Sequence, residues 1–256
     1  MRLRVAVVGK GGVGKSLIAA TLARVLARRG HRVLALDSDT LPGLAVSLGA
    51  DVPREPPLTS AVERGPDDRW RFVSGVGPVR AVQRYATEAP DGVRLLQIGG
   101  TPRFGLRSAA AANNAFFMTI SGLRDAPALR DWVIVGDLPG GPRQAAFGWM
   151  PYADRLLLVV EPTWQAMLTA RRISRIALAA RPGQPLCLVI SKATGEDDAR
   201  RAGAFLDLPV LAAVPADAAV STAERLGVAL LDHAPHCPAV RAIEGLADQL
   251  LAGSMR

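Results

Sequence analysis

A glycine-rich segment near the start of the chain constrains the fold more than any other feature. Residues 9–16 read GKGGVGKS and fit the phosphate-loop pattern of Gly, four residues, Gly, Lys, and Ser or Thr. An apolar segment suited to a strand, residues 2–8, precedes the loop, and apolar residues at helical spacing follow over residues 15–29. A strand, this loop and a helix in that order place successive backbone N–H groups at the positive end of the helix dipole. The sequence therefore predicts a phosphate-binding site at residues 9–16.

The residue types in the loop suit contact with a polyphosphate. Its glycines allow backbone angles and a close approach that a Cβ atom would obstruct. Lys15 can reach the β and γ phosphates, and the Ser16 hydroxyl can join the ligand shell of Mg2+. The expected nucleotide contacts are Gly9, Lys10, Gly11, Gly12, Val13, Gly14, Lys15, Ser16 and Leu17.

Seven apolar segments of strand length recur along the chain, separated mostly by segments of helix length. Most are continuous β-branched or Leu-rich runs, which is typical of strands buried on both faces of a parallel sheet. The expected strands are 2–8, 32–37, 93–98, 132–137, 155–160, 186–190 and 209–214, and the expected helices are 15–29, 164–179, 199–206, 218–225 and 238–251. This pattern predicts the α/β class: a doubly wound, mostly parallel sheet of about seven strands flanked by helices, in a single domain over residues 1–256.

Composition excludes several other classes of protein. The 256 residues are 49% hydrophobic and 21% charged, which is typical of a soluble globular chain and excludes disorder, collagen and coiled coil. No apolar run approaches the roughly 18 residues of a membrane span, and the first strand leads directly into the glycine cluster without room for a signal peptide. With only two cysteines a disulfide framework is excluded. We expect a cytoplasmic protein without a membrane span.

The net charge of +8 comes almost entirely from arginine, which supplies 28 of the 31 Lys and Arg residues. The three lysines are Lys10, Lys15 and Lys192. A compact ammonium suits sites that a guanidinium fork does not. The lysine positions therefore indicate functional sites: two lie in the glycine cluster and one follows a later apolar strand.

Lys10, in addition to Lys15, makes the loop resemble the deviant Walker A motif of the MinD and ParA group of ATPases. In that family the first lysine crosses an ATP-sandwich homodimer and touches phosphate in the other subunit. The resemblance implies that ATP and Mg2+ bind, that the protein is a homodimer when ATP is bound, and that Lys10 and Lys15 are catalytic. It extends over nearly the whole chain through four further landmarks.

The end of the second expected strand is the first of these landmarks. Residues 36–39 read LDSD, similar to the family's DxD segment. Carboxylates two residues apart point the same way in an extended chain, so both can face a phosphate and its metal. The resemblance implies that Asp39 is catalytic, orienting the attacking water, and that Asp37 supports the Mg2+ shell. Thr40 stands where the family commonly has Pro, and a solvated turn is the alternative interpretation.

The end of the fourth expected strand resembles Walker B joined to a switch glycine. Residues 135–141 read VGDLPGG. An acidic residue at the end of a buried strand can hold a Mg2+ water, and the resemblance implies that Asp137 acts with Ser16 and Asp37 at the metal. The Gly140 N–H is expected to sense the γ-phosphate. An ordinary Asp-x-Pro-Gly turn is the alternative.

Two later segments resemble the base-binding loops of the family. Residues 189–194 read VISKAT and residues 214–217 read VPAD. Thr194 stands where guanine readers carry an Asp, which favours ATP over GTP. The segments depart from the family at Ser191, where Asn is usual, and a plain surface loop remains the alternative. The expected base-side contacts are Ser191, Lys192, Pro215, Ala216 and Asp217.

Within the group the chain looks most like the nickel-insertion ATPases that mature carbon monoxide dehydrogenase (CooC-like). Those proteins bind metal through a Cys-x-Cys, whereas the corresponding segment here, residues 99–105, reads GGTPRFG. A metal-transfer role through that site is therefore unsupported. The segment 232–237, DHAPHC, has metal-ligand residue types, but ordinary loop histidines are the favoured interpretation.

These patterns predict a Mg-dependent ATPase that acts as a nucleotide-switched dimer, hydrolyses ATP slowly, and regulates or matures an unidentified client protein. Segments 51–69 and 99–122 are candidates for client contacts. One alternative is a ParA-like module that binds DNA in the presence of ATP, for which Arg171 and Arg175 lie one helical turn apart. In this Arg-rich chain a solvated helix face is the favoured interpretation of those arginines. A second alternative is a nucleotide-binding scaffold with little turnover.

Overall fold

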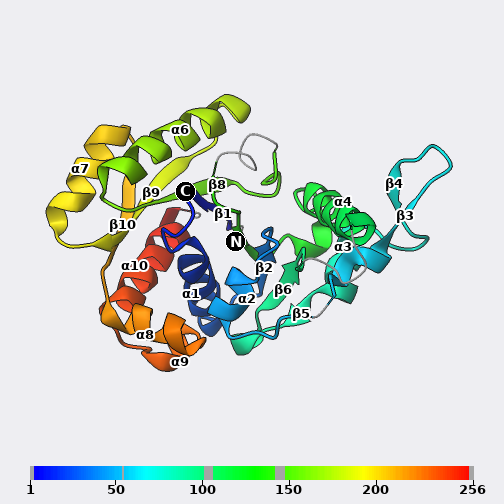
Figure 1. Ribbon diagram of the computed structural model, residues 1–256, viewed down its shortest axis with the longest axis horizontal. Coiled ribbons are helices and arrows are strands. Elements are labelled where there is room, and N and C mark those ends of the chain that lie inside the picture. Colours follow the sequence, from blue (N-terminus) through cyan, green and yellow to red (C-terminus); the bar gives the residue numbers. More distant parts are fainter. Residues whose placement is uncertain (1–2, 54, 101–105, 142–147, 254–256) are drawn as a thin grey trace.

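The structure is a computed structural model that describes residues 3–53, 55–100, 106–141 and 148–253. Its centre is an eight-stranded sheet in the order β10-β9-β8-β1-β7-β2-β6-β5 (Figure 1). Neighbouring strands are parallel except at the edge, where β5 runs antiparallel to β6. The strands are β1 (Arg4–Gly9), β2 (Val33–Asp37), β5 (Thr87–Glu88), β6 (Arg94–Gln97), β7 (Val133–Asp137), β8 (Arg155–Val160), β9 (Leu186–Ala193) and β10 (Val210–Pro215).

Helices cover both faces of this sheet (Figure 1). One face packs against α1 (Lys15–Arg28), α2 (Gly43–Leu48), α8 (Ala218–Leu226), α9 (Leu230–His233) and α10 (Pro238–Gly253). The other face packs against α3 (Pro78–Tyr85), α4 (Leu106–Gly122), α6 (Trp164–Ala180) and α7 (Glu196–Leu206). Because helices lie on both faces, the central strands carry apolar side chains on both faces: Val5 and Val7 of β1 enter one core, and Ala6 and Val8 enter the other.

The first helix illustrates the packing. Ile18, Leu22 and Leu26 follow one another at four-residue spacing and are all buried against the sheet. Burial of each such side chain stabilises the fold by about 2 kcal/mol. This apolar stripe holds α1 on the sheet and so fixes the position of the loop that precedes it.

The sequence-based prediction of a doubly wound, mostly parallel sheet is confirmed. All seven expected strands are present, and the eighth is β5, whose two residues are too few to give a sequence pattern. Segment 51–69, a candidate for client contacts, contains the 3-10 helix Pro57–Ala61 and strand β3 (Val62–Arg64), which pairs with β4 (Trp70–Phe72) in a hairpin at one end of the molecule (Figure 1). The α4 helix extends over 17 residues of segment 99–122, the other candidate for client contacts. Within the described residues, no helix is long and apolar enough to cross a membrane.

Candidate functional site

The glycine-rich loop connects the central strand β1 to α1, as the sequence predicts. Gly14 is the N-cap of α1 and has a φ of 85°, in the left-handed region that non-glycine residues rarely adopt. Lys15 is the first helical residue, and its side chain turns back so that Nζ donates to the backbone oxygen of Lys10, at 3.0 Å. The loop thus curls around a buried ammonium. Lys10 is exposed, and no ion pair to it occurs among the described residues.

The turn after β7 packs directly against this loop. A Cβ atom on Gly140 would lie 2.7 Å from the backbone nitrogen of Gly11, so only glycine allows the contact. The next residue, Gly141, donates its N–H to the oxygen of Gly9 at 3.1 Å. The expected switch glycine therefore lies against the phosphate loop.

Three side chains of the expected metal site meet at the carboxyl edge of the sheet. Asp37 and Asp137 are register partners on β2 and β7 and are 1% and 2% exposed. The Ser16 hydroxyl donates to Asp137 Oδ2 at 2.5 Å. Asp37 Oδ2 and Asp137 Oδ1 are buried without a hydrogen-bond partner in the described part of the chain. Two unpaired carboxylate oxygens beside a hydroxyl are an oxygen donor set that suits Mg2+.

Burial dominates the electrostatics of this edge. Desolvation, reinforced by the neighbouring Asp137 carboxylate, raises the pKa of Asp37 well above its ordinary value. Desolvation also raises the pKa of Asp137 to about 6, although the Ser16 hydroxyl and Lys15 oppose the shift. Burial lowers the pKa of Lys15, and the charges of Asp137 and Asp39 partly restore it. A divalent cation would stabilise the ionised form of these two buried acids.

Asp39 lies beyond the end of β2 at the margin of the same edge. It is half-buried, its N–H donates to Asp37 Oδ1, and its own Oδ1 accepts from the Leu41 N–H, both at 3.1 Å. These contacts fix the turn and leave Oδ2 of Asp39 for another partner. The structure thus brings together Lys15, Ser16, Asp37, Asp39 and Asp137.

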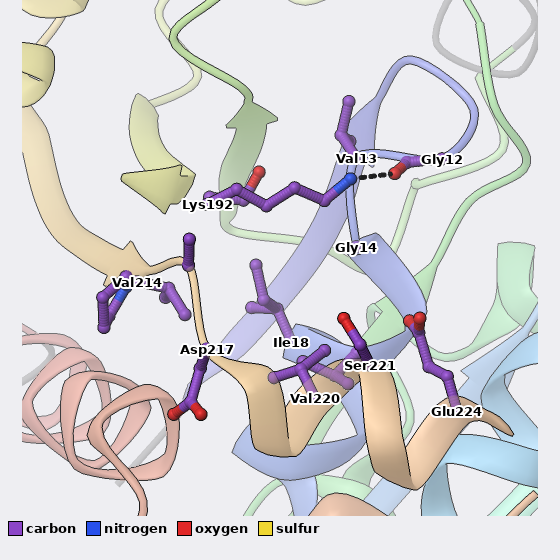
Figure 2. Close-up of a pocket in the computed structure, with 14 residues that line it drawn as sticks. Gly12, Val13, Gly14, Ile18, Lys192, Val214, Asp217, Val220, Ser221 and Glu224 are labelled. Atoms are coloured by element: carbon purple, nitrogen blue, oxygen red, sulfur yellow. Dashed lines mark hydrogen bonds between the residues drawn. The ribbon is translucent and has the colours of Figure 1, made fainter. Parts of the chain in front are cut away.

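A cavity of about 240 Å3 lies beside the phosphate loop (Figure 2). Every expected base-side residue lines it: Ser191, Lys192, Pro215, Ala216 and Asp217, together with the loop residues Gly12, Val13, Gly14 and Leu17. The cavity is mostly apolar, with a few polar groups, as is usual for a site that holds a planar base.

The charged groups of Lys192 and Asp217 form hydrogen bonds with other residues of the protein. Lys192 Nζ donates to the oxygen of Gly12 at 3.1 Å, as Figure 2 shows, and forms an ion pair with Glu161. Asp217 accepts hydrogen bonds from the N–H groups of Ala219 and Ala239, at 2.9 and 3.1 Å, and so joins the first turns of α8 and α10. Both residues shape the cavity by holding its walls. Ser191 is 3% exposed, and its Oγ has no partner among the described residues.

Helix α8, expected over residues 218–225, forms one wall of the cavity, a role that the sequence did not predict. Val220, Ser221 and Glu224 of α8 line it, and in Figure 2 the polar ends of Ser221 and Glu224 lie on the side of α1. Ile18 of α1 completes this wall. Their only sequence signal is spacing, because residues 220, 221 and 224 share one side of a helix that directly follows the Pro215 loop.

Asp198, the acid that contacts Thr194, does not line the cavity. Asp198 Oδ2 accepts hydrogen bonds from the Thr194 N–H and hydroxyl, at 2.8 and 2.9 Å. The acids among the cavity-lining residues are Asp217 and Glu224. The end of β9 therefore brings no carboxylate into the cavity.

The metal-ligand residue types of segment 232–237 do not form a metal site in the described residues. Asp232 of segment 232–237 forms an ion pair with Arg24, at 2.7 Å, and no cluster of three metal-ligand side chains occurs in the ranges that the structure describes. Arg171 and Arg175 are exposed on α6, and the Arg171 guanidinium lies 4.8 Å from the Phe205 ring centre.

A phosphate loop at the carboxyl edge of a parallel sheet, beside two buried acids and an apolar cavity, defines the class of phosphate-loop nucleotide-binding proteins. Residues 5–231 match the model of the CobQ/CobB/MinD/ParA nucleotide binding domain. The chain belongs to that family.

Individual relatives agree with this assignment. The carbon monoxide dehydrogenase accessory protein CooC of Rhodospirillum rubrum is 28% identical, with 92% of each chain covered. An uncharacterized ATP-binding protein of Methanocaldococcus jannaschii is 27% identical over 88% of this chain and 90% of its own. The structure of the septum site-determining protein MinD with Mg-ADP from Pyrococcus horikoshii has a TM-score of 0.73 and 22% identity, covering 100% of this chain and 99% of that one. A likeness at this identity shows the shared fold.

Proposed function

We propose that the protein is a Mg-dependent ATPase that cycles between an open form and an ATP-sandwich homodimer and couples slow hydrolysis to a client protein. The observation that carries the proposal is the pair of lysines in one loop: Lys15 is buried inside it and Lys10 is exposed on it. A buried ammonium serves the nucleotide of its own chain. The exposed ammonium of Lys10, which has no ion pair in the described residues, is free to reach a second chain.

The chemistry is positioning and charge neutralisation. The loop N–H groups and Lys15 hold the β and γ phosphates, and Lys10 of the second chain adds a positive charge. Bound Mg2+ neutralises phosphate charge, and Ser16, Asp37 and Asp137 are the residues that would hold it. Asp39 orients a water for attack on the γ-phosphorus, and the bond to the bridging oxygen breaks to give ADP and phosphate. Gly140, packed on Gly11, senses the loss of the γ-phosphate and releases its loop.

The preference for ATP rests on the cavity. It is mostly apolar, and Thr194 stands at the end of β9 where guanine readers carry an Asp, so no carboxylate from that strand end lines the cavity to pair with guanine. Ser191 Oγ is the unpaired polar atom of the wall. A ligand N–H or ring nitrogen would satisfy it.

Solution mass tests the dimer switch. Light scattering is measured with Mg-ADP and with Mg-ATP on the Asp39→Ala protein, in which ATP persists. The proposal expects a monomer with Mg-ADP and a doubled mass with Mg-ATP. The same mass with both nucleotides would contradict the switch and favour the nucleotide-binding scaffold with little turnover.

The Lys10→Ala variant tests the crossing lysine. Hydrolysis should be abolished, while nucleotide binding, which depends on Lys15 and the loop backbone, is largely kept. Unchanged turnover would remove the assignment of Lys10.

The name of the relative CooC suggests the kind of client. It is an accessory protein of carbon monoxide dehydrogenase, and we infer that this chain likewise regulates or matures a partner protein. The only cysteines in the sequence are Cys187 and Cys237, so a Cys-x-Cys is absent and metal delivery through such a pair is not part of the proposal.

DNA binding is the second candidate, favoured by one feature. Arg171, Arg172 and Arg175 are all exposed on α6, and no ion pair to them occurs among the described residues. Retention on DNA that requires ATP and weakens steeply with salt would support this candidate. An absence of binding at low salt would dismiss it.

A further inference from the structure

Gln97 is an exception in a strand face that is otherwise apolar. Val93 and Leu95 precede it at alternate positions and are buried in the core beneath α1 and α2. Gln97, the last residue of β6, is only 2% exposed, and its Nε2 has no hydrogen-bond partner in the part of the chain described. A buried amide without a partner destabilises a fold, so a glutamine here requires a reason.

The sheet register places Gln97 in one row with the two acids of the metal site. Gln97 is the register partner of Asp37, and Asp37 is in turn the partner of Asp137. All three side chains lie on the same face, because the residues two positions before each of them, Leu95, Ala35 and Val135, belong to the same core. Side chains of directly paired residues on neighbouring strands are within reach of one another.

The unpaired atoms of this row are complementary. Asp37 Oδ1 accepts from the Asp39 N–H, whereas Asp37 Oδ2 is buried and unpaired within the described residues. Asp137 Oδ2 accepts from Ser16, and its Oδ1 is likewise unpaired. The row therefore offers two acceptors and one donor, the Gln97 amide N–H. A cation takes acceptors only, so the donor has a carboxylate as its natural partner.

We propose that Gln97 is a positioning residue of the metal site. Gln97 Nε2 and Asp37 Oδ2 are both without a partner among the described residues; when the site holds Mg2+, Nε2 donates to Asp37 Oδ2 and holds that carboxylate in the orientation that supports the cation. This inference rests on the proposed function, in which the site holds a Mg-nucleotide. Gln97 does not touch the nucleotide. It acts through Asp37, as an outer hydrogen-bond partner that orients a metal-supporting carboxylate.

The test measures equilibrium binding of a fluorescent ADP analogue, mant-ADP, during a Mg2+ titration and separately in EDTA. Gln97→Met keeps the length of the side chain and removes the donor. We expect the Mg2+ concentration at half-maximal binding to rise about tenfold, the effect of losing one hydrogen bond to a charged group. Binding in EDTA should stay within about twofold of wild type, because the phosphate loop is untouched.

A second variant distinguishes a donor from a ligand. In Gln97→Glu a carboxylate faces Asp37, so a positioning donor is replaced by a repelling charge and Mg2+ dependence should weaken further. If the amide oxygen instead served as a metal ligand, Gln97→Glu would strengthen Mg2+ binding, and this result would overturn the proposal. Gln249→Met, at an exposed position on α10, is the matched control and should change nothing.

The outcomes separate this inference from the proposed function. Wild-type protein whose mant-ADP binding ignores Mg2+ would contradict the metal-nucleotide site itself. If wild-type binding of mant-ADP depends on Mg2+ but Gln97→Met has the same Mg2+ concentration at half-maximal binding, only the role of Gln97 is overturned. An equal loss of binding in EDTA and in Mg2+ would show a structural role and also overturn it. Circular dichroism checks whether Gln97→Met folds. If it does not, Gln97→Asn, which keeps the amide on a shorter side chain, must raise the Mg2+ concentration at half-maximal binding.

Discussion

The two halves of the nucleotide site are built in different ways. The phosphate half consists of one continuous loop and the ends of β2 and β7, and its Lys15, Asp37 and Asp137 side chains are buried. The base half is a cavity whose walls come from the phosphate loop, β9, β10 and α8, and it is mostly apolar. The phosphate half depends on charge and fixed backbone, so single changes there should have large effects. The base half depends on shape, so its residues should be more tolerant.

Removal of the buried lysine should have the largest effect. Lys15→Ala takes away the ammonium that the loop encloses, and turnover should fall about a hundredfold to a thousandfold. Nucleotide affinity measured with mant-ADP should fall as well. Arg175→Ala, the loss of an exposed cation on α6, is the control and should leave both quantities unchanged. Equal effects of the two variants would contradict a specific role of Lys15 in the phosphate half.

The buried acids should make the stability of the protein depend on pH. The pKa of Asp137 is raised from 3.8 to about 6 by burial, so the folded state favours the protonated form. The stabilising contribution of that form is complete below pH 3.8 and is lost as the pH rises through about 6. Relative to Asp137→Asn, the wild-type protein should therefore lose about 3 kcal/mol of unfolding free energy between acidic and neutral pH.

Urea denaturation in EDTA at several pH values measures this loss. A constant difference between wild type and Asp137→Asn would contradict it. Addition of Mg2+ at neutral pH should stabilise wild type and not Asp137→Asn, because the cation binds the ionised carboxylate.

Filling the cavity should separate the base half from the phosphate half. Val220→Phe adds a ring to the wall formed by α8 and should weaken ATP binding about tenfold by excluding the base. Inorganic triphosphate, which lacks a base, should compete with mant-ADP as well as before. Val228→Phe, at an exposed position beyond α8, is the matched control. A parallel loss of triphosphate binding would mean that the two halves are not independent.

The smallest effect is expected where the halves meet. Lys192 contacts the Gly12 oxygen and Glu161, and it is 56% exposed on its side chain. Lys192→Ala should weaken nucleotide affinity only about threefold, because an exposed ion pair contributes little. High salt should have a similar effect on wild type, measured by the same titration. A loss as large as that of Lys15→Ala would place Lys192 within the phosphate half.

The phosphate half was largely predictable because its signals are local. A loop that must bind phosphate between a strand and a helix restricts residues 9–16 strongly, and Asp37 and Asp137 follow apolar runs that mark buried strands. The base half was predicted at Ser191 and Pro215, which lie at strand ends, but Val220, Ser221 and Glu224 were missed. Nothing in the order of residues says that α8 turns its side toward the N-terminus of α1, about two hundred residues earlier.

The sequence by itself determined the class of fold, the phosphate loop and the acids that accompany it, because backbone angles, strand burial and phosphate charge act over a few residues. The tertiary structure alone decided which face Gln97 shares with Asp37, which carboxylates are already satisfied, as Asp217 and Asp198 are, and how α8 closes the cavity. These features depend on strand register and helix packing, which join residues distant in the chain. Local sequence patterns do not indicate which distant residues will be neighbours in the fold.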